Sequence, residues 1–274
     1  MSAFRLGEDL HGGWFRSLFA SQNPAGLGRA IGIFVLLFVL NLALQLGLTV
    51  VILKGVLGGE FSDFALLAKA NVLAIFPASI PLAVCAIFLA PSRGATAGEV
   101  LSLRWPRFGV LGWVLVIGGF LVFMAAFMVV VTTAFGIDLS QYDPSSNNPL
   151  SPVNPKRVVE QVMFELSGDK TLFLYSLLSV GIGAPVAEEF IFRGQIFTAL
   201  SKTRLGFIGT AVVTSAGWAS LHFSEPLIFL GTIFIMGLVF SWMLYRFGSL
   251  WVTLACHCVW NLTQAFLIQT QLSP

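Results

Sequence analysis

The stretch IGIFVLLFVLNLALQLGLTVVIL, residues 31–53, decides the fold class of this chain. It carries no charge and is about as long as the ~20 residues that a helix needs to cross ~30 Å of hydrocarbon. Asn41 and Gln45 lie one helical turn apart within it, and we expect them to form hydrogen bonds to a neighbouring helix. The stretch therefore predicts a transmembrane helix.

Further apolar stretches of similar length follow this first one. Hydrophobic residues make up 57% of the 274-residue chain and charged residues only 10%, against roughly 25% charged residues in a soluble domain. The sequence predicts an all-α, polytopic transmembrane helix bundle of about seven spans, the second of which bends at its two prolines. The six later spans are expected at 70–90, 109–135, 171–200, 206–223, 227–244 and 250–269.

The parts between the spans complete the predicted organisation. Residues 1–30 mix aromatic and leucine side chains with charges, which is typical of an interfacial helix. Residues 31–274 are expected to form a single transmembrane domain. The loop 136–170 ends in a helically spaced apolar pattern, at Val158, Val159, Val162, Met163 and Leu166, that favours a segment on the membrane surface.

The distribution of basic residues predicts the orientation in the membrane. With a cytoplasmic N-terminus, five Lys and Arg residues lie outside, Arg193 lies within a span, and nine lie inside: Arg5, Arg16, Arg29, Arg93, Arg104, Arg107, Lys202, Arg204 and Arg246. We therefore expect an integral membrane protein with its C-terminus outside. The short loops and compact size favour a bacterial inner membrane. No basic run indicates a nucleic-acid partner.

Two acidic residues lie where charge is costly. Glu188 and Glu189 fall inside the apolar stretch IGAPVAEEFIFRGQIF, residues 182–197, and ionisable groups at membrane depth are mostly functional. Glu189 and Arg193 share a helix face at i, i+4, whereas Glu188 is rotated by about 100°. One carboxylate can pair with the arginine while the other faces a cavity as a general base. The alternative is a charge cluster at the end of the span.

Two of the three histidines also lie in predicted spans. His222 ends the run GWASLHF, and His257 lies in LACHCVWNL with Asn261 one turn later. Each histidine alone is explained by helix packing, but together with the glutamates they can hold a water and stabilise an oxyanion. Cys256 and Cys258 are about 200° apart on a helix and cannot both join His257 at one ion, so these thiols are expected in the core.

Three motifs in this order resemble those of the CPBP intramembrane metalloproteases, which include CAAX prenyl protease 2 and bacteriocin-processing enzymes. The first, EExxxR, matches the acidic pair and its arginine. The second, FxxxH, matches at His222, with Trp218 where Phe is usual. The third, HxxxN, matches at His257 and Asn261. The resemblance covers about 171–265 and leaves the first three spans without a motif.

The resemblance implies an intramembrane endopeptidase that cleaves a membrane-associated protein or peptide from a site open to the cytoplasm. Carried over by position, Glu188 would activate a water that His222 helps to hold, and Glu189 and Arg193 would orient the site. The oxyanion would be stabilised by His257 and Asn261.

A metal ion is left open by the resemblance, because both a divalent metal, with zinc first, and a direct glutamate mechanism suit this family. Glu188, His222 and His257 are the candidate ligands. Asn261 is a poor zinc ligand, which favours its role at the oxyanion. The sequence identifies neither a prenylated substrate nor an oligomeric state.

Two other functions compete with the protease. A catalytically inactive scaffold or immunity protein could keep the fold, and a small proton-coupled transporter could use the glutamates as a relay. Transport would be supported by inverted repeats, and the sequence has none. For a shared site, His222 must come close to Glu188, so we expect the turn after the fifth span to be recessed within the protein.

Overall fold

The computed structural model describes residues 26–92, 94–137, 162–163, 165–223, 225 and 227–272, with the side chains from 268 onward left aside. Residues 1–25 of the predicted interfacial segment and most of the loop 136–170 lie outside these residues, whereas 27–30 already belong to the first helix. The described chain is helical, with one isolated bridge between Ser92 and Ala95. Its helices are α2 (Leu27–Gly55), α3 (Phe64–Leu89), α4 (Ala97–Val100), α5 (Val110–Ala134), α7 (Lys170–Leu178), η2 (Ser179–Gly183), α8 (Ala184–Glu188), η3 (Glu189–Ile196), α9 (Phe197–Leu200), α10 (Gly206–Ser220), α11 (Leu227–Phe247) and α12 (Leu250–Leu272).

Six of these helical runs in the described residues are long and apolar enough to cross a membrane: α2, α3, α5, the run α7–α9, α11 and α12. Helices α2 and α5 leave aliphatic side chains such as Val39 and Val122 exposed, as contact with lipid requires. The protein is therefore an all-α, polytopic, integral membrane protein.

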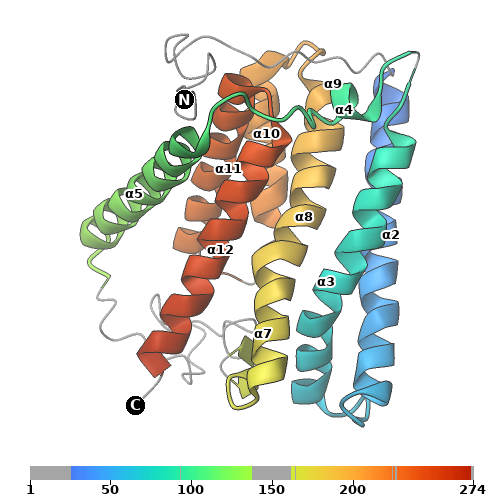
Figure 1. Ribbon diagram of the computed structural model, residues 1–274, viewed down its shortest axis with the longest axis vertical. Helices are drawn as coiled ribbons and strands as arrows, with labels where there is room; N and C mark the ends of the chain where they lie inside the picture. Colours follow the sequence, from blue (N-terminus) through green and yellow to red (C-terminus); the bar gives the residue numbers. More distant parts are fainter. Residues whose placement is uncertain are drawn as a thin grey trace, which may run out of the picture.

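The prediction of about seven spans needs a correction at α10. This helix has 15 residues, which give roughly 22 Å at 1.5 Å per residue, too short for the hydrocarbon core. Figure 1 shows that α10 ends well above the lower ends of α2, α3 and α12. His222 follows this early end and is half-buried, between the exposed side chains of Leu221 and Phe223. The physical reason is the turn around Glu225, which stops the helix before the apolar pattern ends.

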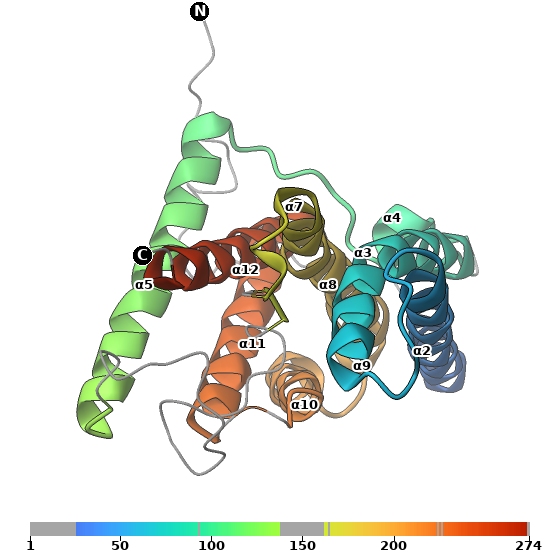
Figure 2. The same cartoon turned by 90° about the horizontal axis from the view of Figure 1, so that it is seen from below.

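The run α7–η2–α8–η3–α9 is the central element of the bundle. It contacts α3 on one side and α12 on the other, as Figure 1 shows. Helices α2 and α3 pair along their length, and α10 pairs with α11. Helix α5 leans away from the bundle and touches α12, as seen from below in Figure 2.

Two π-helical segments, η2 and η3, interrupt the central run. Ala184 donates its N–H to Ser179 O, five residues back. In that register the next carbonyl, Val180 O, would bond to residue 185, but Pro185 has no N–H to donate. Asn261 supplies the missing donor, because its Nδ2 lies 2.9 Å from Val180 O.

A second proline in the bundle is compensated in the same way. Pro77 within α3 leaves Leu73 O without its helical partner, and the Ser179 hydroxyl donates to that carbonyl at 3.4 Å. Beside it, a Cβ at Gly183 would come within 2.7 Å of Phe76 Cα. Only glycine lets α3 approach the central run so closely. This contact fixes the position of the turn that follows, α8, which ends at Glu188.

The connection from α4 to α5 crosses the upper end of the bundle (Figure 1). Ser102 O accepts the N–H of Leu250 at 2.8 Å, and Leu103 O accepts the Trp251 indole N–H at 2.9 Å. At its start, the backbone N–H and hydroxyl of Thr96 donate to Glu99 and hold the pKa of that carboxyl below its usual value. The connection thereby joins the first three helices to α12.

The described end of the loop before α7 is packed on the bundle. Val162, Met163 and Leu166 are buried. They pack with Val72 of α3, with Phe173 of α7 and with neighbouring apolar side chains. These three residues therefore pack against the bundle, whereas Val158 and Val159 lie outside the described residues.

Candidate functional site

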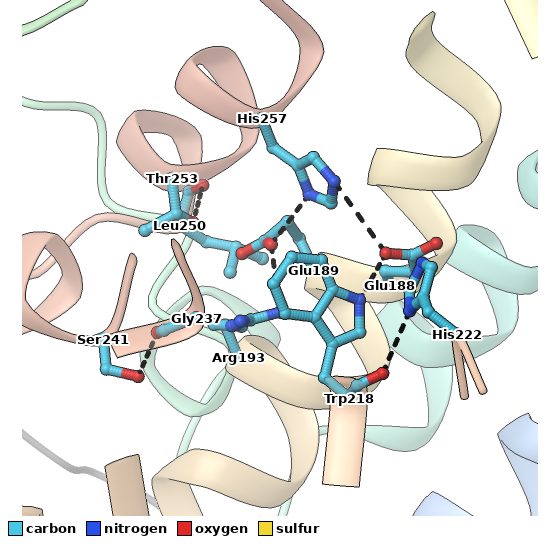
Figure 3. Close-up of polar contacts among 10 residues, drawn as sticks. All are labelled: Glu188, Glu189, Arg193, Trp218, His222, Gly237, Ser241, Leu250, Thr253 and His257. Atoms are coloured by element: carbon cyan, nitrogen blue, oxygen red, sulfur yellow. Dashed lines mark hydrogen bonds and ion pairs between the residues drawn. The ribbon is translucent and has the colours of Figure 1, made fainter. Parts of the chain in front are cut away.

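The indole of Trp218 is the centre of the candidate site. It lies in the last turn of α10 and is 1% exposed. Figure 3 shows acidic, basic and imidazole side chains from the central run, α10 and α12 gathered around this ring. The position of the ring follows from the packing of α10 against α11 and η3.

Glu188, the last residue of α8, presents its carboxylate to this indole. Oε2 accepts the Trp218 Nε1–H at 2.5 Å and lies 3.8 Å from Nε2 of His257. The side chain is 23% exposed. Oε1 accepts no hydrogen bond from the part of the chain that the structure describes, so one oxygen of the carboxylate is free to bind a water.

Glu189, the next residue, is fully buried at the start of η3. Its Oε1 accepts the Nδ1–H of His257 at 3.1 Å and lies 3.3 Å from Nη1 of Arg193. The i, i+4 pair that the sequence predicted is present, although the helix is of the π type. The neighbouring glutamates thus have different environments, one paired and dry, the other partly open.

Arg193 is held mainly by aromatic rings. Its guanidinium carbon lies 4.2 Å from the Trp218 ring centroid and 5.5 Å from that of Phe240. Its Nη1 is close to Glu189, but none of its nitrogens makes a well-oriented hydrogen bond within the described residues. Cation–π attraction over a ring can replace such bonds in a dry site.

His257 of α12 lies between the two glutamates. Its ring packs edge-on against Trp218, with centroids 5.3 Å apart, and lies 5.1 Å from the ring of Phe240. Because Nδ1 is bonded to Glu189, Nε2 faces Glu188. The imidazole therefore has one nitrogen directed at each glutamate.

His222, in the turn after α10, contacts the other edge of the indole. Its ring centroid lies 5.7 Å from that of Trp218, and its Nδ1–H donates to Trp218 O at 3.1 Å. That bond leaves Nε2 with a lone pair. Glu188 and His222 therefore both touch one indole (Figure 3), as a shared site requires.

Asn261 lies one turn after His257 on α12 but is committed to the backbone. One of its two N–H groups donates to Val180 O at 2.9 Å. No hydrogen bond joins it to the glutamates or histidines within the described residues. The structure thus brings five of the six predicted site residues around Trp218 and leaves Asn261 at the edge.

Comparison with protein families adds one finding to this geometry. Residues 170–263, about a third of the chain, match the family model of the type II CAAX prenyl endopeptidase Rce1-like proteins. This part of the chain is an Rce1-like domain. Comparisons with curated proteins and with solved structures give no match.

The Rce1-like domain includes the whole cluster, from the central run to α12. Its matched residues begin at the first residue of α7 and end just after Asn261. Helices α2, α3 and α5 lie outside the match, yet Phe34 of α2 packs on Phe192 of η3 and Phe120 of α5 packs on Phe240. The first three helices therefore support the domain from outside.

A metal ion does not fit the arrangement well. Within the described residues, no group of three or more His, Cys, Asp and Glu side chains is placed to hold an ion. Of the predicted ligands, Glu188 and His257 approach each other, but Trp218 directs an N–H at the same Glu188 oxygen, where a cation would be repelled. His222 contacts the Trp218 indole that lies next to them, and it is not placed as a third ligand.

The sequence prediction missed the role of Trp218. It identified this residue only as an aromatic variant in the FxxxH motif, one turn before His222. An indole N–H next to a membrane-buried acid is a signal that could have identified it, because Trp in a dry interior needs a hydrogen-bond partner.

Proposed function

We propose that this protein is an intramembrane endopeptidase that hydrolyses a peptide bond of a membrane-associated protein or peptide. The Rce1-like family match supports the reaction class. The observation that carries the residue roles is Glu188, with one oxygen bound to the Trp218 indole, which His222 also contacts, and the other oxygen without a hydrogen bond from the described residues.

In this reaction Glu188 is the general base. A water donates hydrogen bonds to Glu188 Oε1 and to the lone pair on His222 Nε2. Glu188 takes one proton as the water oxygen attacks the carbonyl carbon, and that proton then passes to the leaving amine. Groups poised within hydrogen-bond distance of the water are what general-base catalysis requires.

The oxyanion forms on the side of α12. An N–H at His257 Nε2 and the second N–H of Asn261 would donate to it, and such donors are often the largest single catalytic contribution. Glu189 and Arg193 hold the His257 ring in place through Nδ1. No step uses a metal ion, so we expect cleavage to continue in the presence of a membrane-permeant chelator.

The experiment is a cleavage assay with a membrane-tethered reporter or substrate in cells. Glu188→Gln keeps the size of the side chain and removes its basicity, so cleavage should fall at least a hundredfold while expression is unchanged. Glu60→Gln is the matched control, because Glu60 forms an exposed ion pair with Lys54 away from the site. Full cleavage by Glu188→Gln would show that Glu188 is not the general base. Absence of cleavage by the wild-type protein would indicate a scaffold, and proton-dependent solute uptake would indicate a transporter.

The Glu188→Gln strain also serves to find the substrate. An inactive enzyme should retain its uncleaved partner, which mass spectrometry of the purified complex would identify.

We further propose a bacterial inner-membrane location with a cytoplasmic N-terminus, and one transmembrane domain over residues 31–274 with its catalytic core at about 171–265. The partners are then membrane lipid and the membrane-anchored substrate.

A further inference from the structure

We infer that Trp218 is a positioning residue whose indole N–H fixes the catalytic carboxylate of Glu188. The inference rests on the proposed function and extends it to a residue with no acid–base chemistry of its own. It concerns the N–H group specifically, as distinct from the aromatic ring that surrounds it.

The contacts of Trp218 separate these two parts of the side chain. The ring packs against Arg193, His222 and His257, and any large aromatic could supply part of that packing. The Nε1–H has one partner, Glu188 Oε2. It is the only hydrogen-bond donor to Glu188 within the described residues.

This donor decides which oxygen of Glu188 meets the water. With Oε2 held by the indole, the carboxylate cannot rotate toward His257, whose Nε2 lies 3.8 Å from the same oxygen. Oε1 is left as the base. Without the N–H, the carboxylate can pair with His257, and both the base and the oxyanion donor would be lost for part of the time.

Two changes remove the N–H. Trp218→Phe keeps an aromatic ring, and Phe is the residue of the FxxxH motif, so we expect the variant to fold. Incorporation of 3-benzothienylalanine at position 218 keeps the indole shape and replaces the N–H with sulfur. Trp251 provides the matched controls, because its indole N–H donates to Leu103 O at 2.9 Å outside the site.

We expect both changes at position 218 to lower kcat roughly ten- to a hundredfold with KM unchanged, since a hydrogen bond to a charged group is lost in the reacting complex. The same changes at position 251 should leave kcat within about twofold of wild type. A purely structural role for Trp218 predicts normal kcat for the shape-matched benzothienylalanine enzyme, and that result would overturn the inference even if Trp218→Phe did not fold.

The assay also includes Glu188→Gln in parallel. If that variant is inactive and the benzothienylalanine enzyme has wild-type kcat, the inference on Trp218 fails alone. If Glu188→Gln cleaves normally, the proposed function fails, and the role of Trp218 has no basis.

Discussion

Arg193 shows how one residue can hold a charge in a membrane interior. Its guanidinium is fully buried, with one carboxylate at 3.3 Å and two aromatic faces around it. Burying a charge is costly unless it is paired, so each member of this group depends on the others. Single substitutions of Arg193 or of the residues around it are therefore expected to disturb the whole site.

Removal of the Arg193 charge should destabilise the protein. Arg193→Met leaves Glu189 buried without its cation, and such a loss costs roughly 3–5 kcal/mol. The free energy of unfolding in mixed micelles measures it. Glu189→Gln combined with Arg193→Met should recover much of this loss, because no unpaired charge remains. Equal destabilisation by the single and double variants would contradict the ion pair.

Gly237 of α11 provides a second test of the space around Arg193. A Cβ there would lie 2.7 Å from Ser215 Oγ and 3.1 Å from Arg193 Nη2. Gly237→Ala should therefore displace the guanidinium from the Trp218 ring and lower cleavage at least tenfold. Gly231 lies on the same helix with nothing near its Cβ position, so Gly231→Ala should keep wild-type activity. Similar activity of the two variants would show that the packing is loose.

At the scale of elements, the central run depends on backbone carbonyls that prolines leave unpaired. Val180 O and Leu73 O accept from Asn261 and Ser179 instead. Such rescue by side chains is how membrane helices tolerate proline. Asn261 thus connects α12 to the run that carries Glu188, in addition to any role at the oxyanion.

A double-mutant cycle tests this connection. Asn261→Leu should lower the free energy of unfolding by roughly 1–3 kcal/mol, because a buried carbonyl loses its donor. In a Pro185→Ala background the new backbone N–H can bond within the same turn, so the same substitution should cost less. If Asn261→Leu costs the same in both backgrounds, the account of Val180 O is wrong.

The sequence allowed the helices to be predicted but not their type. Apolar length predicted six spans to within about six residues at each end, but it counted α10 as a seventh. The i, i+4 spacing identified the Glu189–Arg193 pair correctly. The π-helices could not be predicted, because they depend on where Ala184 N–H finds its acceptor and on the contact of Gly183 with α3. The role of Trp218 likewise depends on tertiary contacts, since the packing of α10 against the central run, α11 and α12 directs its N–H at Glu188.

At the scale of the whole molecule, the short helix α10 determines the site. A full-length span would carry His222 past Glu188, whereas 15 residues place both against one indole. The error in the predicted span count has this cause, because hydropathy continues through the turn. Because α10 returns only part of the way, α11 runs in the same direction as the central run α7–α9, and the start of α2 and the end of α12 lie at opposite ends of the bundle (Figure 1).

Cysteine labelling tests this topology. The α2–α3 and α9–α10 connections lie at opposite ends of the bundle in Figure 1. In a variant with Cys85, Cys256 and Cys258 replaced by alanine, a membrane-impermeant maleimide should label Ser62→Cys in intact cells. Arg204→Cys should be labelled only after the cells are broken. The reverse pattern would show that the N-terminus lies outside.

The central claim is that Glu188 activates a water within the membrane, and oxygen-18 tracing in proteoliposomes measures this directly. A single turnover of the substrate recovered from the Glu188→Gln strain is carried out in ¹⁸O-labelled water and followed by mass spectrometry. The account predicts one ¹⁸O atom in the new C-terminal carboxylate of the product and none in the enzyme. Label in the Glu188 side chain would show that the glutamate attacks the peptide bond itself, and would contradict the account.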